Sequence, residues 1–343
     1  MTTSEREITE AVDLCVDGGS RLNPAARGWS RFPLHRCNLG PATGNTKRWD
    51  YWAILAPDLA ISAVYSDIDV LGLADVYWVD LRSHDSGTRA IITGPGEGIS
   101  LPDVPSSAPL LVNSGGLDLA ISDDAAGTHL LASWIDADGR PSRLSATVAL
   151  APGHESVNVV IPWSDELFNF TSKHQARAAV GELIVGDVTR SFGGSSGDAW
   201  GVLDVGRGRW PHEITWNWGG GAGRTGAHVV GLQFGARWTR DSGFTENGVT
   251  LNGRLSKIGR ELEWSYDWDA PLEPWRVVDA GGQLDVTLTP RFDKVTSVAV
   301  SAELGSEVHQ VFGTWRGSVV SDEGERVQFD GLLGFAEEAR QRW

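Results

Sequence analysis

Val249-Thr250-Leu251-Asn252-Gly253-Arg254-Leu255-Ser256 is the stretch that decides the fold. Apolar and polar residues alternate on both sides of an Asn-Gly pair, and this pair is the strongest short signal for a two-residue turn between antiparallel strands. A second hairpin is predicted further along, where residues 317–320 and 326–329 flank the turn-forming residues 321–324. The C-terminal part of the chain is therefore expected to consist of antiparallel β-hairpins.

The same alternation with a period of two residues recurs along most of the chain, for example over residues 59–65 and 282–289. Gly, Asn, Asp and Pro separate these stretches, and the chain contains 42 glycines. Strands that alternate with long helices are not indicated, and short helices are expected only near Asp165–Asn169 and Phe335–Arg342. The prediction is an all-β protein made of two tandem lipocalin-like antiparallel β-barrels.

The length of 343 residues is sufficient for two domains with well-buried cores. A strand-rich half ends near residue 163 and another begins near residue 178, with no low-complexity linker between them. We therefore predict one barrel domain over residues 1–170 and a second over residues 171–343, which carries most of the tryptophan-rich motifs. Because no linker separates them, the two barrels are expected to share an intimate interface.

Composition excludes several classes of partner. Lys and Arg total 29 and Asp and Glu total 45, so the formal net charge of −16 disfavours nucleic acid and anionic membrane surfaces. Two cysteines, Cys15 and Cys37, are too few for a disulfide framework and fit a reducing compartment. The polar first ten residues do not resemble a signal peptide, and no apolar run is long enough to span a membrane. A cytoplasmic protein is expected, and no signal indicates an oligomeric state.

Tryptophan is unusually frequent, with 16 Trp against 4 Tyr. In an extended strand, His212, Ile214, Trp216 and Trp218 would share one face. Large indoles can simply fill a core, but each indole N–H also needs a partner, which suits a partly polar cavity. Both interpretations stay open: plain core, or an aromatic pocket for an apolar ligand in the second barrel, close to Trp238 or Trp275.

Two short motifs match known patterns but lack the required context. Residues 221–226 spell GxGxxG, but a strand-like stretch follows instead of the helix that a dinucleotide site needs. Residues 193–197 spell GxSxG without the strand and helix of a nucleophile elbow, so a loop is expected. The eight histidines include no HxH or HxxxH pair, so local spacing predicts no metal site.

An ordered series of Trp, Gly and Asn motifs resembles a large bacterial family that is labelled only as a domain of unknown function. The resemblance covers nearly the whole chain and is densest from about residue 174 to residue 343. This family is distantly similar to carotenoid hydratases of the hydroxyneurosporene synthase type, which have tandem lipocalin-like barrels. The matching motifs are at residues 202–211, 214–218, 237–239, 243–247, 252–255, 257, 264, 274–276, 309–313 and 343.

The resemblance implies a cavity for a long apolar molecule and cofactor-independent addition of water to an alkene, the reverse reaction, or isomerisation. Such chemistry needs a proton donor, a base for water and an apolar cage in which Trp faces stabilise a developing cation. Among matched positions, Asp204, Glu246 and His309 have suitable side chains for catalysis. The residues expected to bind the substrate are Trp210, His212, Trp216, Trp218, Trp238, Asn247 and Trp275.

Each catalytic candidate also has a purely structural explanation. Asp204 could pair with Arg207 or Arg209, Glu246 could hold a turn, and His309 could make a hydrogen bond at a strand end. The expected functions are correspondingly a lyase or isomerase of an apolar small molecule, a carrier that binds such a molecule unchanged, or a structural barrel. A fold alone does not decide among them.

Overall fold

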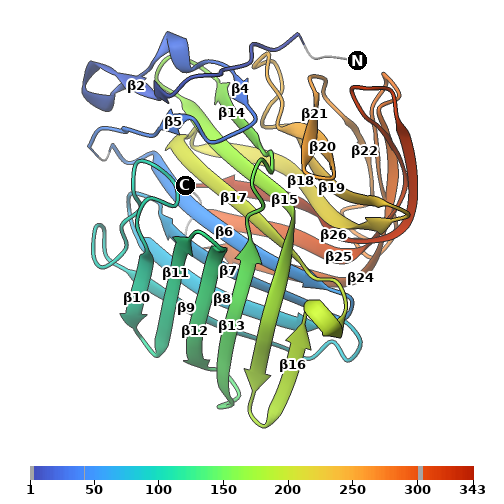
Figure 1. Cartoon of the computed structure of the whole chain (residues 1–343). Coiled ribbons are helices and arrows are strands. Elements are labelled where there is room, and N and C mark those ends of the chain that lie inside the picture. Colours follow the sequence, from blue (N-terminus) through green and yellow to red (C-terminus); the bar gives the residue numbers. More distant parts are fainter. Residues whose placement is uncertain (1–3, 42, 300–303) are drawn as a thin grey trace.

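The protein is almost entirely β-structure in a computed structural model that describes residues 4–41, 43–299 and 304–343 (Figure 1). The helical segments in these ranges are three short 3₁₀ turns, η1 (Asp17–Gly19), η2 (Pro24–Ala26) and η3 (Gly194–Ser196). None of them is long and apolar enough to cross a membrane. Two large antiparallel sheets form one nearly closed barrel and one half-barrel, which confirms the predicted all-β fold of two barrels.

The first sheet contains 13 strands in the described part of the chain. Ten of them follow the order β10-β11-β12-β13-β15-β17-β6-β7-β8-β9, and β4, β14 and β16 pair beside this path. The strands are β4 (Trp29–Ser30), β6 (Thr46–Ala56), β7 (Leu59–Asp67), β8 (Gly72–Asp80), β9 (Ser86–Thr93), β10 (Leu110–Ser114), β11 (Leu117–Asp124), β12 (Gly127–Ile135), β13 (Pro141–Ala149), β14 (Val157–Pro162), β15 (Phe168–Val185), β16 (Val188–Phe192) and β17 (Trp200–Arg209).

The second sheet has nine described strands in the order β21-β20-β19-β18-β26-β25-β24-β23-β22. They are β18 (Glu213–Thr225), β19 (His228–Ala236), β20 (Asn247–Leu251), β21 (Arg254–Ile258), β22 (Glu263–Ser265), β23 (Trp275–Val278), β24 (Leu284–Ala299), β25 (Gly305–Val320) and β26 (Arg326–Arg342). Near the N-terminus, β1 (Val12–Asp13) pairs with β5 (His35–Arg36), and β2 (Cys15–Val16) pairs with β3 (Arg21–Leu22).

The chain passes from the first sheet to the second between β17 and β18, at residues 210–212. The expected domain boundary at residues 170 and 171 falls inside β15, a continuous strand that pairs with β13, β14 and β17 of the first sheet. The pairing of β15 with β17 shifts register between His174 and Arg177. A β-bulge of this kind bends the strand, so one long strand can pair with several neighbours. The first sheet therefore continues to Arg209, the last residue of β17.

Both predicted hairpins are confirmed. Asn252 and Gly253 connect β20 to β21 with φ angles of 53° and 80°, the left-handed pair that a type I′ turn requires. β25 and β26 pair across the turn at residues 321–325. The GxGxxG stretch lies at the end of β18 and in its turn into β19, and the GxSxG stretch is the loop that contains η3.

The two predicted helices are wrong. Residues 165–167 form a bend that leads into β15, and Phe335–Arg342 lies inside β26. The C-terminal stretch is rich in Ala, Glu and Arg, which favour helices in isolation. Pairing on both sides, with β18 and β25, satisfies its backbone groups as a central strand and overrides that local preference.

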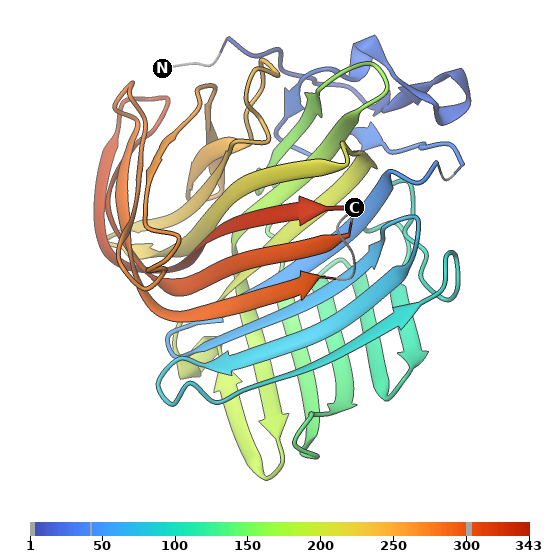
Figure 2. The ribbon, with the colours of Figure 1, turned by 180° about the vertical axis from the view of Figure 1, so that it is seen from behind.

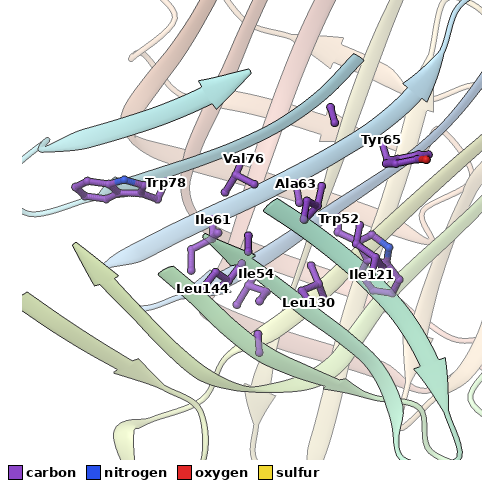
Figure 3. Packing of buried hydrophobic residues seen from close by; sticks show 14 of the residues in the cluster. Trp52, Ile54, Ile61, Ala63, Tyr65, Val76, Trp78, Ile121, Leu130 and Leu144 are labelled. Carbon is purple, nitrogen blue, oxygen red and sulfur yellow. The ribbon is translucent and has the colours of Figure 1, made fainter. Parts of the chain in front are cut away.

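Each barrel has a separate hydrophobic core. Side chains that point into the first barrel, among them Trp52, Ile61, Val76 and Trp78, pack in its interior (Figure 3). Inside the second barrel, Phe234, Trp275 and Trp315 belong to another buried cluster. Because alternate residues of a strand point to opposite faces, the other half of each strand faces outward.

The two barrels pack together by these outer faces. From behind, β24, β25 and β26 run across the molecule beside β6, β7 and β8 of the first barrel (Figure 2). A solid cluster that includes Ala53, Val202, Phe312 and Phe335 joins the two sheets. The space next to this cluster, still between the outer faces, forms a cavity lined by both barrels.

Candidate active site

A cavity of about 320 Å³ lies between the outer faces of the two barrels. Strands β6, β7, β8, β15 and β17 line it from the first barrel, and β18, β24, β25 and β26 line it from the second. Its walls combine indoles and aliphatic side chains with several charged groups. The lining residues are Trp49, Tyr51, Val64, Ser66, Ile68, Leu73, Asp75, Asn169, Thr171, Lys173, Asp204, Trp210, Trp216, Trp218, Trp238, Glu246, Lys294, Thr296, Val308, Glu337, Gln341 and Trp343.

One row of side chains crosses the first barrel at the base of the cavity. Strand register places Lys173, Asp204, Tyr51, Val64 and Asp75 side by side on five neighbouring strands, from β15 to β8. All five side chains line the cavity because they lie on the outward face of their strands. The first barrel therefore contributes a row with charged side chains at both ends and Tyr51 and Val64 between them.

A matching row crosses the second barrel. Trp218, Glu337, Gln310 and Lys294 are register neighbours on β18, β26, β25 and β24. The two rows face each other: Lys173 Nζ lies 4.3 Å from the Trp218 ring centroid. Tyr51 also donates a hydrogen bond of 3.3 Å to Gln310 Oε1.

The charged side chains of the two rows are buried or half-buried because apolar residues lie on either side of the rows. On β6, β17, β25 and β26, the residues two positions along in one direction are Ala53, Val202, Phe312 and Phe335 of the apolar cluster that joins the barrels. In the other direction lie Trp49, Leu73, Trp216 and Val308, which form apolar walls. The charged rows are thus the floor of a pocket whose sides combine these apolar residues with Ser66, Thr171 and Thr296.

Three charged groups meet at one end of this floor. Lys173 Nζ lies 2.9 Å from Asp204 Oδ2 and 3.3 Å from Glu246 Oε2. Asp204 also accepts hydrogen bonds from the Trp49 indole N–H and the Thr171 hydroxyl, both at 3.2 Å. All three charged side chains are buried. One buried cation is shared by two carboxyl groups, so the group carries a net negative charge when Glu246 is ionised.

Glu246 reaches this position from the loop before β20. Its Oε1 accepts a 2.7 Å hydrogen bond from the Trp238 indole N–H. Gly235 lies beside it on β19, and a Cβ at that position would overlap the Glu246 carboxyl. Burial raises the pKa of Glu246 to about 7, although the neighbouring Lys173 ammonium opposes this shift.

A second glutamate enters the cavity from β26. Glu337 Oε1 accepts a 2.8 Å hydrogen bond from the Trp216 indole N–H, and its Oε2 accepts a 2.9 Å bond from Gln310 Nε2. Burial raises its pKa to about 7 as well, against the opposing effect of the hydrogen bond from Trp216. The cavity therefore contains two carboxyl groups that exchange protons near neutral pH.

A cluster of six tryptophans lies at one end of the cavity, and all of them except Trp163 line it. Trp210 is central: its ring stacks on Trp238 with centroids 5.5 Å apart and contacts Trp49 and Trp163 at 5.3 and 5.0 Å. Trp216 and Trp343 complete the group. Trp210 donates its indole N–H to Asn169 Oδ1, so the polar edges of these rings are used while their faces remain apolar.

Six of the residues singled out from the sequence line this one cavity. Asp204 and Glu246 are brought together through Lys173, and Trp210, Trp216, Trp218 and Trp238 lie around them. The ion pair of Asp204 is with Lys173, whereas Arg207, one of its expected partners, pairs with Asp50. The cavity lies between the barrels and not inside the second barrel, where the sequence placed it.

The other four predicted residues lie elsewhere. His309 follows cavity-lining Val308 on β25, so it points to the opposite face, where it contacts Asp293 Oδ2 at 2.7 Å. His212 is exposed and contacts the backbone carbonyl of Trp343. Asn247 is bonded to the backbone of Gly235 and Arg260, and Trp275 stacks on Tyr266 in the core of the second barrel.

Sequence reasoning missed Lys173 and Glu337. Lys173 follows Asn169 and Thr171 at intervals of two, an alternation that marks the polar face of a strand. Glu337 lies in the stretch that the sequence predicts to be helical, and a helix gives it no place on a strand face. Among the described residues, no group of three or more His, Cys, Asp and Glu side chains is arranged to hold a metal ion.

Fold and cavity together define a class: all-β proteins with two barrels packed back to back around an aromatic cavity with buried charges. The chain belongs to the family described as domain of unknown function DUF2804, whose model matches residues 5–343. This confirms the resemblance noted from the sequence motifs. A search of the curated proteins gives no significant match.

Several solved structures match this chain over most of its length. Kievitone hydratase from Nectria haematococca has a TM-score of 0.51 at 10% sequence identity, with 86% of this chain and 88% of that chain covered. CghA with Sch210972 has a TM-score of 0.44 at 12% identity, with 87% and 88% covered. At 10% identity the similarity to kievitone hydratase concerns the fold alone.

Proposed function

We propose that this protein is a cofactor-independent lyase or isomerase that acts on an apolar small molecule bound between its two barrels. The observation that carries the proposal is the pair of cavity-lining glutamates, Glu246 and Glu337, whose pKa values are both raised to about 7. General acid–base catalysis works best when the pKa of the catalytic group is near the working pH. Raised carboxyl pKa values in an apolar cavity are also typical of functional sites.

The hydrogen-bond partners suggest which glutamate has which role. Glu246 lies next to the Lys173 ammonium, which favours its ionised form, so we assign it as the base. Glu337 is bonded instead to neutral donors, an indole and an amide, so we assign it as the acid. In a hydration, Glu337 would give its proton to one alkene carbon, and Glu246 would take a proton from the water that attacks the other.

The surroundings support a cationic intermediate. Protonation of an alkene leaves a positive charge on carbon, which indole faces and nearby carboxylates can stabilise. Trp218 is the direct register partner of Glu337, Trp216 donates its indole N–H to the same glutamate, and Asp204 adds a negative charge. After addition of water, Glu246 holds the extra proton and Glu337 lacks one, and exchange with solvent restores both. The reverse sequence would remove water, and loss of a proton without water attack would move the double bond.

The fold likeness to kievitone hydratase is consistent with this reaction class, and the proposal depends on the side chains of this chain. Its test begins with incubation of the purified protein with fractionated cell extract. Mass spectrometry would then compare the small molecules before and after incubation. Products that differ by the mass of water, or isomers of equal mass, are expected with the wild-type protein and not with Glu337→Gln. Molecules that bind but remain unchanged would instead identify a carrier.

A further inference from the structure

The floor of the cavity has a second polar end, far from Lys173 and Glu246. Asp75 on β8 is three strands away from Asp204 in register, which corresponds to about 14 Å at the usual strand spacing. Lys294 on β24 is two strands from Glu337 on the facing sheet. Both side chains line the cavity, and each influences the charge state of the other.

Neither group is fully satisfied by the protein. Asp75 Oδ1 is buried and has no hydrogen-bond partner among the described residues. Lys294 Nζ lies 3.4 Å from Ser62 Oγ, at the outer limit of a hydrogen bond, and 4.3 Å from the ring centroid of Tyr77. Buried polar groups without partners are costly, so their presence on a cavity floor indicates a ligand group that completes them.

The hydrogen-bonding chemistry of Asp75 and Lys294 determines which ligand group can bind between them. An ammonium can only donate hydrogen bonds, while the neighbouring carboxyl can accept one. A hydroxyl group both accepts and donates, so it can bridge the two. A ligand carboxylate fits less well, because it would lie close to Asp75 and within the field of Glu337.

Between the two polar ends the first barrel presents no charged side chain, and Glu337 faces this stretch from the second barrel. Val64 and Tyr51 separate Asp75 from Asp204 on the floor, and Leu73 and Val308 lie above them on the walls. A ligand that reaches from one end to the other therefore needs an extended apolar body.

We propose that Asp75 and Lys294 form a subsite for a hydroxyl group at the end of the ligand farthest from Lys173 and Glu246. The substrates would then be elongated, largely apolar molecules with a hydroxyl group at one end. The subsite rests on the proposed function only for the placement of the reacting carbons near Glu246 and Glu337.

Binding of three probes of the same shape tests the subsite without any turnover. The probes are trans-stilbene, 4-hydroxystilbene and stilbene-4-carboxylate, titrated into the full-length protein at pH 7 while tryptophan fluorescence is recorded. We expect 4-hydroxystilbene to bind about tenfold more tightly than trans-stilbene, because a hydroxyl bonded to charged partners contributes this much. Equal affinities for these two probes, or tightest binding of the carboxylate, would overturn the proposal.

Variants of Asp75 and Lys294 test whether these two residues cause the preference for 4-hydroxystilbene. Asp75→Leu/Lys294→Met replaces both charges by apolar side chains of similar size, so no unpaired charge remains to prevent folding. It should bind trans-stilbene at least as well as the wild type and should lose the preference for the hydroxyl probe. Thr296→Val, a change on the same strand and cavity wall, should keep that preference. A tenfold preference that survives in the double variant would place the hydroxyl elsewhere and contradict the proposal. Because no reaction is measured, failure of the proposed catalysis would leave this result unaffected.

Discussion

Lys173 of the first barrel places its ammonium nitrogen 4.3 Å from the ring centroid of Trp218 in the second. The same nitrogen pairs with Asp204 from its own sheet and with Glu246 from the other half of the chain. Although burial alone would lower the pKa of Lys173, these two carboxylates raise it. One cation therefore links the two barrels and sets the charge of the cavity floor.

Activity should show a bell-shaped dependence on pH, with its maximum close to pH 7. Glu246 must be ionised to accept a proton and Glu337 must be protonated to donate one, and both pKa values are raised to about 7. The two apparent pKa values belong to the pair of groups because they share one cavity. Once a substrate is known, kcat/KM measured from pH 5 to pH 9 checks this. A rate that rises steadily to pH 9 would exclude Glu337 as the acid.

Lys173→Met should destabilise the protein more at pH 8 than at pH 5. The change leaves Asp204 and Glu246 buried without their cation, and breaking a buried pair in this way costs about 3–5 kcal/mol. At pH 5 the loss shrinks because Glu246, whose pKa rises further without Lys173, is protonated. Urea unfolding at both pH values measures the difference.

Lys47→Met is the matched control for that change. Lys47 is as buried as Lys173, but its ammonium group donates to the Ile68 backbone carbonyl at 2.8 Å instead of forming an ion pair. Its replacement should not show the same dependence on pH. Equal losses for Lys173→Met at pH 5 and pH 8 would argue against a role of that lysine in holding carboxylates ionised.

Glu337→Gln should stabilise the protein at pH 8 and have little effect at pH 5. The folded state holds the Glu337 proton up to about pH 7, whereas the unfolded chain releases it near pH 4.5. The stability contributed by the glutamic acid is therefore complete below pH 4.5 and is lost as the pH rises through 7. The largest difference is about 3 kcal/mol, and glutamine, which does not ionise, avoids it. Thermal melts of both proteins across this range test the sign, and a Glu337→Gln protein that is less stable at pH 8 would contradict it.

Gly235→Ala should reduce both stability and activity, because the new methyl group would occupy the space of the Glu246 carboxyl. Displacement of Glu246 removes the hydrogen-bond partner of Trp238, and overpacking of this kind typically costs about 1–3 kcal/mol. In Gly235→Ala/Glu246→Ala the shorter side chain relieves the overlap. This double variant should regain stability relative to Gly235→Ala without regaining turnover, as a double-mutant cycle can measure. Additive losses would show that Gly235 does not act through Glu246.

The fold was largely predictable because turn chemistry and alternation are local signals. Asn252-Gly253 determined one hairpin, and the period of two residues identified most strands. The failure at Phe335–Arg342 has a different origin, since that stretch is a strand only because β18 and β25 lie on both sides of it. No local pattern contains this information.

The candidate site was predictable only in part, for the same reason. Asp204 and Glu246 have suitable side chains, but they meet through Lys173, a residue that only the register of β15 and β17 places beside Asp204. His309 illustrates the opposite error, because a one-residue step along β25 separates it from the face that lines the cavity. Which face of a strand meets the partner barrel depends on packing between distant segments.

Because the cavity is built from the outer faces of the barrels, the residues that contact a ligand are not those that hold each barrel together. Substitutions at Leu73, Val308 or Thr296 would reshape the chamber while the interior clusters stay intact. The usual conflict between evolving a new specificity and remaining folded is thereby weakened. Relatives with this architecture could diversify their ligands quickly, and libraries restricted to these outward positions offer a practical route to new activities on the same scaffold.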